Sequence, residues 1–224
     1  MFTMDHDQAS AAPRRKTGRP LSFDRDAALE QAMLTFWRHG YETTSIVDLT
    51  TAMGVTAPSL YTAFGDKKRL FLEAAYRSAG DPEVMAQAID GAPSAHDAAR
   101  EMLTAAAIAY TGDATPKGCL LASATASCSA ASADVQSAIA DIRRSIAGRL
   151  RARVDRDTAA GVLPPETDAP ALVGLVMAVT QGMSTLARDG TPRASLLAIV
   201  EVALQGWPRK QARARAGAKV GRRS

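Results

Sequence analysis

Apolar side chains recur at intervals of three and four residues along most of this 224-residue chain, the spacing that places them on one face of a helix. The clearest run steps from Val135 through Ile142 to Val154. Apolar residues make up 46% of the chain and aromatic residues only 5%, with no convincing alternation of apolar and polar positions. The pattern predicts an all-α fold of about nine helices.

Capping residues and helix breakers divide residues 24–79 into four helices. The expected N-caps are Asp24, Thr44 or Ser45, Thr56 and Asp66, and the expected breaks are Gly40, Gly54, Gly65 and Gly80. Beyond them, the Asp81-Pro82 pair and residues 91–94 indicate turns. The remaining helices are expected around residues 102–110, 119–128, 135–154, 168–188 and 193–206.

The net charge of +4 is unevenly distributed along the chain. Residues 1–20 carry +2 and residues 208–224 carry +7, so the body between them carries −5. Basic tails on an acidic body are typical of arms that lie near a polyanion. For the C-terminal tail, simple solubility is an equally good explanation.

No apolar stretch approaches the ~20 residues needed to span a bilayer, and the polar N-terminus does not resemble a signal peptide. We therefore expect a cytoplasmic protein without a membrane partner. Cys119 and Cys128 lie nine positions apart, so on one helix they would point to opposite faces. We expect buried structural thiols rather than a disulfide or a metal site.

Two short helices separated by Gly54, at residues 45–53 and 57–64, have the layout of a helix-turn-helix. The expected inward residues are Ile46, Leu49, Met53, Val55, Leu60 and Phe64, and the expected outward residues are Thr56, Ala57, Ser59, Tyr61, Thr62 and Ala63. The outward side chains are mostly small or carry hydroxyl groups, so the backbone of the second helix can approach the base edges in a major groove. The pattern alone is shared with any helical hairpin.

The candidate contacts to DNA differ in kind. Ala57 can touch a thymine methyl group, Ser59 and Thr62 can bind base edges or phosphates, and Tyr61 has the length to reach a phosphate. Phosphate clamps are expected from Lys67, Lys68 and the free N–H groups near Thr44 and Ser45, and a minor-groove contact from the Arg14–Arg19 segment, ending at Arg19. The second helix contains no Arg, Asn or Gln, which favours readout by DNA shape and phosphate contacts.

The stretches Gly40-Tyr41-Glu42-Thr43-Thr44-Ser45-Ile46, Met53-Gly54-Val55-Thr56 and Leu60-Tyr61-Thr62-Ala63-Phe64-Gly65-Asp66-Lys67 resemble the DNA-binding domain of the TetR/AcrR family of bacterial regulators. The resemblance covers about residues 19–71. It implies an all-helical homodimer that binds a palindromic operator, with Tyr61 and Lys67 on phosphates and repression as the default. The Thr62-Ala63 pair departs from the larger basic or aromatic pair of many relatives, which leaves the direct base contacts open.

The resemblance also implies a domain organisation. We expect a flexible basic arm at residues 1–20, the helix-turn-helix domain at 21–66, an effector-binding and dimerisation domain at 67–206 that begins with a linking helix, and a disordered basic tail at 207–224.

The family usually dimerises through its last two helices, and this chain has a matching pattern there. Gly174, Ala178 and Gly182 form a strip of small residues at four-residue spacing, which would let a partner helix approach closely. The expected interface adds Leu172, Leu175, Leu196, Ile199, Val200 and Ala203. The alternative is that these faces pack only within one protomer.

An unknown small-molecule effector is expected among the middle helices. The candidate ligand residues are Met102, Tyr110, Cys119, Ser123, Met177 and Gln181, which mix apolar area with hydrogen-bonding groups, although each is also a natural core residue. The segment Lys117-Gly118-Cys119-Leu120-Leu121 resembles a TetR subgroup with members that respond to electrophiles or metals, so Cys119 is also a candidate sensor thiol.

Two other classes of function compete with a regulator. An enzyme is not expected, because His6, His39 and His96 stand outside any catalytic motif. A nonspecific or architectural DNA-binding protein that uses only its basic tails is the alternative to a regulator. No cofactor and no metal site are expected.

Overall fold

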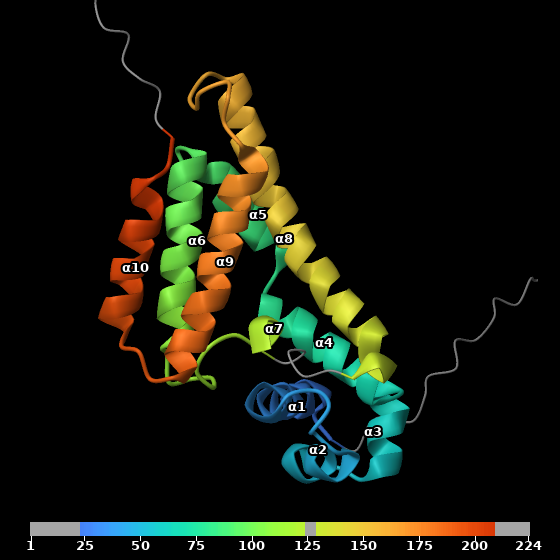
Figure 1. The fold of residues 1–224 in the computed structure, drawn as a ribbon. Helices are drawn as coiled ribbons and strands as arrows, with labels where there is room; N and C mark the ends of the chain where they lie inside the picture. Colours follow the sequence, from blue (N-terminus) through green and yellow to red (C-terminus); the bar gives the residue numbers. More distant parts are fainter. Residues whose placement is uncertain (1–22, 124–128, 209–224) are drawn as a thin grey trace, which may run out of the picture.

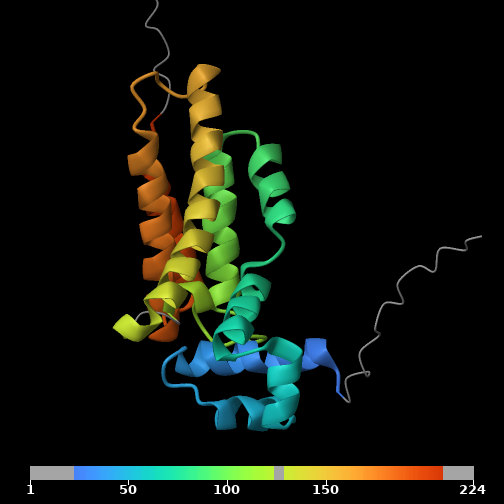
Figure 2. The same ribbon diagram turned by 90° about the vertical axis from the view of Figure 1, so that its right-hand side faces the viewer.

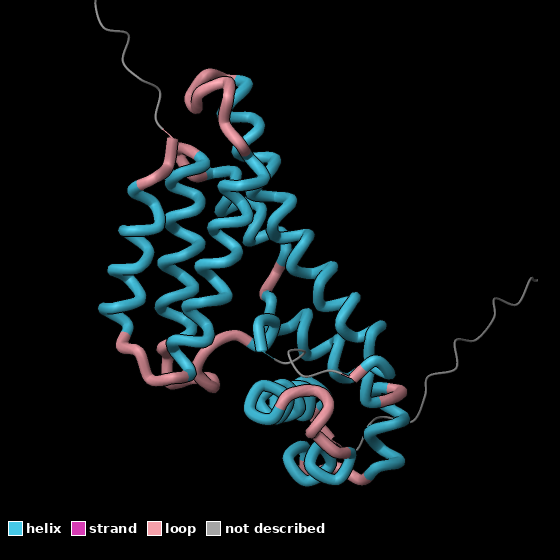
Figure 3. Tube along the Cα trace, in the orientation of Figure 1, coloured by secondary structure: helices cyan, strands magenta, loops and turns pink. Residues whose placement is uncertain are grey.

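The computed structural model describes residues 23–123 and 129–208, and all its regular structure in these ranges is helical (Figure 3). The helices are α1 (Arg25–His39), α2 (Ile46–Met53), α3 (Ala57–Phe64), α4 (Lys67–Ala79), α5 (Pro82–Gly91), α6 (Ala95–Tyr110), α7 (Leu120–Ser123), α8 (Ala133–Ala159), α9 (Ala169–Arg188) and α10 (Arg193–Gln205), with a 3₁₀ turn at Ala130–Ser132. The predicted all-α fold is confirmed. The predicted arm, Cys128 and the tail from residue 209 lie outside the described residues.

Local capping chemistry sets the helix ends much as the sequence predicts. The Asp24 carboxylate accepts hydrogen bonds from the N–H groups of Asp26 and Ala27 at the start of α1, and Gly40 ends that helix with a positive φ of 84°. Ser45 and Thr56 cap α2 and α3 through their hydroxyl groups. These caps bond backbone groups that a helix terminus leaves without partners.

The two turn signals at residues 81–94 enclose a helix, α5, that the sequence analysis did not assign. Asp81 caps it and Pro82 occupies its first turn, where a missing N–H costs no hydrogen bond. Ile89 is the one residue of α5 that is fully buried, although Val84, Met85, Ala88 and Ile89 recur at helical spacing.

Two apolar cores divide the molecule into a head and a body. The head core consists of α1–α4, α7 and the first part of α8, and the body core of α5, α6, α9, α10 and the second part of α8. The 27-residue α8 belongs to both, with Val135 and Ile139 in the head core and Leu150 and Val154 in the body core. Figures 1 and 2 show α8 running from the far end of the body down to the head.

The folded units differ from the expected domain limits at two places, helix α4 and Trp207. Helix α4 was expected to open the effector domain, but Leu70, Phe71 and their neighbours on α4 pack in the head core. Trp207, which the sequence places in the basic tail, is 4% exposed and packs in the body core. The aromatic side chain therefore extends the folded body beyond α10.

Helix α9 corrects the expectation that no segment is long and apolar enough to cross a membrane. Within the described ranges, α9 alone passes that test by length and composition. Core helices of soluble proteins pass it too, and α9 buries Val173, Val176 and Met183 against its own body. Its apolar composition therefore reflects helix packing together with the exposed apolar face described below.

Candidate functional site

Helices α2 and α3 form the helix-turn-helix at the end of the molecule opposite the tip of the body (Figure 1). Gly54 turns the chain between them with φ 65° and ψ 32°, a left-handed conformation that glycine adopts without strain. Leu49, Met53, Leu60 and Phe64 are buried, and Ile46 and Val55 pack partly against the same core. The predicted inward side of the motif is confirmed.

The outward side of α3 is small and rich in hydroxyl groups. Thr56, Tyr61 and Thr62 are exposed, whereas Ala57, Ser59 and Ala63 are half-buried. The Thr56 and Ser59 hydroxyls lie 2.9 Å apart, and the Thr62 hydroxyl donates to the Pro58 carbonyl oxygen at 2.8 Å. Each hydroxyl oxygen keeps acceptor capacity for an external donor.

The two residues before α2 are more engaged than the sequence suggests. Thr44 is 1% exposed, and its hydroxyl donates to the Gly40 carbonyl oxygen at 2.6 Å. The Ser45 N–H donates to the Asp48 carboxylate at 2.8 Å, so the expectation of a free N–H at Ser45 is wrong. The cause is a capping box, in which Ser45 caps α2 and Asp48 reaches back to the N–H of Ser45. Bonding to Ser45 lowers the pKa of Asp48.

Lys67 and Lys68, at the start of α4, make contacts inside the protein. The Lys67 ammonium lies 4.6 Å from the centre of the Tyr41 ring and donates to the Glu42 carbonyl oxygen at 3.4 Å. Lys68 forms an ion pair with Asp134 of α8. Both side chains are half-buried, so each lysine holds its contact within the protein and still faces solvent.

Arg25 holds α3 in place, a role that sequence reasoning missed. Its guanidinium binds both carboxylate oxygens of Glu73 at 2.5 and 2.8 Å, and donates to the Ala63 carbonyl oxygen at 3.3 Å. The same group lies 4.3 Å from the centre of the Phe64 ring. Glu73 raises the pKa of Arg25. No local sequence signal could reveal this contact, because the two charged residues are 48 positions apart.

Arg69 was also missed. Its side chain is 77% exposed at the beginning of α4, beside the two lysines. Its position in the same basic first turn is the signal that could have added it to the expected phosphate clamps.

The predicted ligand residues do not gather around one cavity. Tyr110 is 9% exposed and contacts Cys119, and burial, followed by the Cys119 thiol, raises the pKa of Tyr110. Met102 and Met177 pack against the body core, and Cys119 lies between the two cores. Ser123 and Gln181 line a separate cavity.

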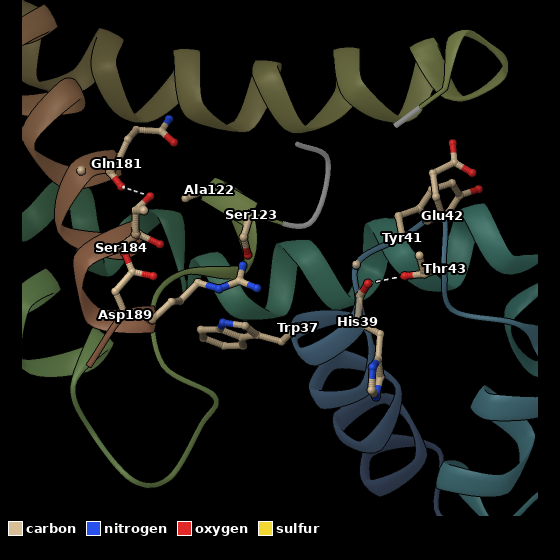
Figure 4. A pocket seen from close by; sticks show the side chains of 14 residues that line it. Trp37, His39, Tyr41, Glu42, Thr43, Ala122, Ser123, Gln181, Ser184 and Asp189 are labelled. Carbon is tan, nitrogen blue, oxygen red and sulfur yellow. Dashed lines mark hydrogen bonds between the residues drawn. The ribbon is translucent and has the colours of Figure 1, made fainter. Parts of the chain in front are cut away.

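That cavity, of about 540 Å³, lies between head and body (Figure 4). One wall is formed by Trp37 and residues 39–43, and the others by residues 122–123 of α7 and the segment 181–189 of α9. Figure 4 shows the Trp37 indole below Ser123, with Gln181 and Asp189 on the α9 side.

The loop before α7 is locked onto α9. Gly118 has a φ of 85°, and a Cβ atom there would lie 2.7 Å from the Ser184 carbonyl oxygen. The Cys119 N–H donates to the Ser184 hydroxyl at 2.9 Å. These contacts fix Cys119 beside Tyr110 and set the position of α7 at the cavity.

The expected dimer face is largely open in the single chain. Gly174, Ala178 and Gly182 are exposed, and Cβ atoms added at the two glycines would meet nothing within 4 Å. Leu175 beside them is 43% exposed, and Leu172 is half-buried. A row of small and apolar residues on α9 is thus available to a partner.

The α10 part of that face is narrower than expected. Leu196 and Val200 are 0% and 1% exposed, so they belong to the core of their own protomer. Ile199 and Ala203 are half-buried, and Val202, which the sequence analysis did not select, is 66% exposed. A period of three to four identifies an apolar helix face, but it does not say whether the protomer or a partner covers it.

Comparison with known proteins gives concordant matches for head and body. Residues 28–74 match the family described as bacterial regulatory proteins, tetR family, and residues 98–202 match the tetracyclin repressor-like C-terminal domain. The HTH-type transcriptional repressor ComR of Escherichia coli (strain K12) is 34% identical over 197 residues, which cover 87% of this chain and 94% of ComR.

Solved structures agree with these matches. A cysteine-substituted form of the TetR family transcriptional regulator CifR, complexed with a 26 bp double-strand operator DNA, is 40% identical with a TM-score of 0.80 and covers 85% of this chain and 100% of that one. A putative TetR regulator from Rhodococcus sp. RHA1 is 36% identical with a TM-score of 0.57, covering 82% of this chain and 98% of its own. The chain described here belongs to the TetR family of bacterial regulatory proteins.

Proposed function

We propose that this protein is a homodimeric transcriptional repressor that binds a palindromic operator and leaves it when a small effector binds the body. The observation that carries the proposal is the exposed outward face of α3, held by Arg25 against α1 and α4. The similarity to a repressor and to a regulator solved on operator DNA supports the same function. Because the proposed target is operator DNA, we place this protein in the cytoplasm.

The proposed DNA contacts follow from exposure. Thr56, Ala57, Ser59 and Thr62 approach base edges in the major groove, where their small size permits close contact. Tyr61, which is 47% exposed, binds a phosphate. Lys67, Lys68 and the exposed Arg69 supply further phosphate contacts. Arg19, in the arm outside the described residues, is proposed to enter the adjacent minor groove.

Dimerisation is a geometric requirement of this proposal. Two recognition helices read successive major grooves on one face of DNA only when they lie about one helical turn, ~34 Å, apart. The open strip on α9, with Ile199 and Ala203 of α10, is the proposed contact between protomers.

The effector-binding region is proposed on either side of α7. Tyr110 and Cys119 form a polar pair within the body, with Met102 and Met177 supplying apolar area nearby, whereas Ser123 and Gln181 face the cavity. Cys119 remains a candidate sensor thiol. Replacing Cys119 by Ser should abolish any response of operator binding to alkylating agents, and an unchanged response would remove the thiol from the proposal.

Genomic footprinting of the purified protein tests the function as a whole. A specific regulator protects one or a few palindromic sites, retains them in excess random DNA and loses affinity when α3 is altered at Tyr61. Binding that ignores sequence, falls steeply with salt and disappears on deletion of residues 209–224 would instead identify an architectural protein that acts through its tail.

A further inference from the structure

The cavity between head and body has the size of a small-molecule site. Its volume of about 540 Å³ falls within the ~300–1,000 Å³ that is usual for such sites. Its walls come from segments about 140 residues apart in the sequence, the end of α1 with the loop that follows and the second half of α9.

The cavity wall offers hydrogen-bond donors that lack acceptors. The Nε1 atom of Trp37 is buried and has no hydrogen-bond partner among the described residues. The Arg188 guanidinium, on the opposite wall, takes part in no ion pair or hydrogen bond that joins the residues the structure describes. The buried Trp37 N–H without an acceptor is unfavourable, and a ligand that brings an acceptor removes that penalty. Arg188 is exposed and offers its guanidinium to an anion in the cavity.

Neither acidic residue of the wall forms an ion pair with Arg188 within the part of the chain that the structure describes. The Glu42 carboxylate accepts bonds from the N–H and hydroxyl of Ser129, both at 2.9 Å, which hold it toward the start of α8. Asp189 is exposed at the end of α9. Arg188 is the group best placed to bind an anion, because its stem packs against the loop at Gly118, where no Cβ intervenes.

We propose that this cavity binds a small aromatic carboxylate, with the carboxylate on the Arg188 guanidinium and the Trp37 indole as the surface for its ring. A guanidinium binds a carboxylate through two parallel N–H groups, and an indole offers both a flat apolar face and an N–H donor. The proposal deepens the proposed function, on which it rests, by naming the site and chemistry of the effector.

A ligand in this position acts directly on the helix-turn-helix. The wall at residues 39–43 leads into the Ser45 cap of α2, and Thr44 is bonded back to Gly40 within it. The same loop is bonded through Glu42 to Ser129, just before the 3₁₀ turn that leads into α8, and to α4 through Lys67. Displacing this wall therefore changes how the head sits on the body.

Binding can be measured without DNA, because the chain has only two tryptophans and Trp207 lies elsewhere, in the body core. The probe is 4-nitrobenzoate, a nitroaromatic carboxylate that quenches indole fluorescence, added to the dimeric full chain carrying Trp207→Phe. We expect saturable quenching of Trp37, with 4-nitrobenzamide, the uncharged analogue, binding at least about tenfold more weakly. Calorimetry on the wild-type chain gives the same comparison should the Trp207 variant not fold.

Arg188→Gln is expected to weaken 4-nitrobenzoate binding at least about tenfold, whereas Arg144→Gln, at an exposed arginine of α8, leaves it unchanged. Absence of saturable binding, equal binding of the amide, or equal loss in both variants would overturn the site.

The effector role is tested on the footprinted operator. By thermodynamic reciprocity, operator DNA must change the affinity for 4-nitrobenzoate by the same factor as the ligand changes the affinity for operator. Binding with no such change overturns the coupling. If the chain binds 4-nitrobenzoate but protects no operator, the proposed ligand site stands and the proposed repressor function is refuted.

Discussion

Arg153 and Asp157 lie one turn apart on α8 and form a buried ion pair, with 3.0 Å between Nε and Oδ1 and 7% exposure for each residue. Arg153 also donates to the carbonyl oxygens of Ile89 and Asp90 at 2.9 and 3.1 Å. Asp157 accepts the Ala95 N–H at 2.6 Å. The pair thus bonds the end of α5 and the start of α6, fixing the turn between them on α8.

Asp157→Asn should reduce the free energy of unfolding by about 3–5 kcal/mol, because it leaves the Arg153 charge buried without its partner. Arg151 and Asp155 provide a matched control with the same spacing on the same helix, but with side chains 46% and 55% exposed. Asp155→Asn should cost less than about 1 kcal/mol. Urea denaturation of both variants measures the difference, and equal losses would contradict the structural role of the buried pair.

The loop at Gly118 gives a second test of stability. Gly118→Ala should destabilise the fold for two reasons, the positive φ of 85° and the 2.7 Å approach of a Cβ to the Ser184 carbonyl oxygen. Gly190 isolates the first reason, because its φ is 89° and nothing lies within 4 Å of an added Cβ. We expect a loss of about 1 kcal/mol for Gly190→Ala and about 2–3 kcal/mol for Gly118→Ala in thermal denaturation. A similar loss at both positions would exclude the close approach as the cause.

Arg25→Gln tests how α3 is held. The variant loses the two bonds to Glu73 and the contact with Phe64, so α3 should become more mobile and operator affinity should fall about tenfold. The pair is 38% exposed on both sides, so its share of global stability is expected to stay near or below about 1 kcal/mol.

Arg77→Gln is the control for Arg25, since Arg77 joins the same two helices through Asp26 at 3.7 Å, with Asp26 82% exposed. Hydrogen exchange should increase in α3 only for Arg25→Gln. Equal operator affinity of the two variants would show that Arg25 does not position the recognition helix.

The contact between the loop before α2 and the segment that leads into α8 depends on pH in part through Glu42. Its hydrogen bonds with Ser132 and Ser129 lower its pKa from the ordinary value of 4.5. A lowered folded-state pKa stabilises the fold fully above the unfolded value, and the contribution disappears as the pH falls through the folded value. The wild type should therefore have a higher Tm than Glu42→Gln at neutral pH, with the difference shrinking below pH 4.5. A pH-independent difference would contradict an ionised Glu42 as its source.

Sequence patterns predicted what depends on neighbours in the chain. Caps such as Ser45 and Thr56, the turn at Gly54 and the inward residues of the helix-turn-helix all rest on contacts within a few positions. Helix α5 lies between two turn signals, and its apolar residues Val84, Met85, Ala88 and Ile89 do stand at helical spacing, so this helix was within reach of sequence analysis.

The features that sequence analysis missed arise from distant segments. Arg25 meets Glu73 across 48 positions, and the cavity brings Trp37 to α9. Leu196 and Val200 show a further limit, because a residue on an apolar helix face can be buried by its own chain or by a partner with the same sequence pattern. Only the packing of α10 against the body distinguishes the two.

Ala178→Glu tests the proposed dimer contact, because Ala178 lies between Gly174 and Gly182 on the open strip of α9. A carboxylate there would be buried without a partner between two helices, so we expect monomers by light scattering and a loss of operator affinity, since a single recognition helix reads one half-site. Ala152→Glu, at an exposed alanine of α8, is the matched control and should remain dimeric. Both variants should keep the helix content of the wild type by circular dichroism, because neither alanine is buried in the protomer. A dimeric Ala178→Glu variant would place the contact between protomers elsewhere.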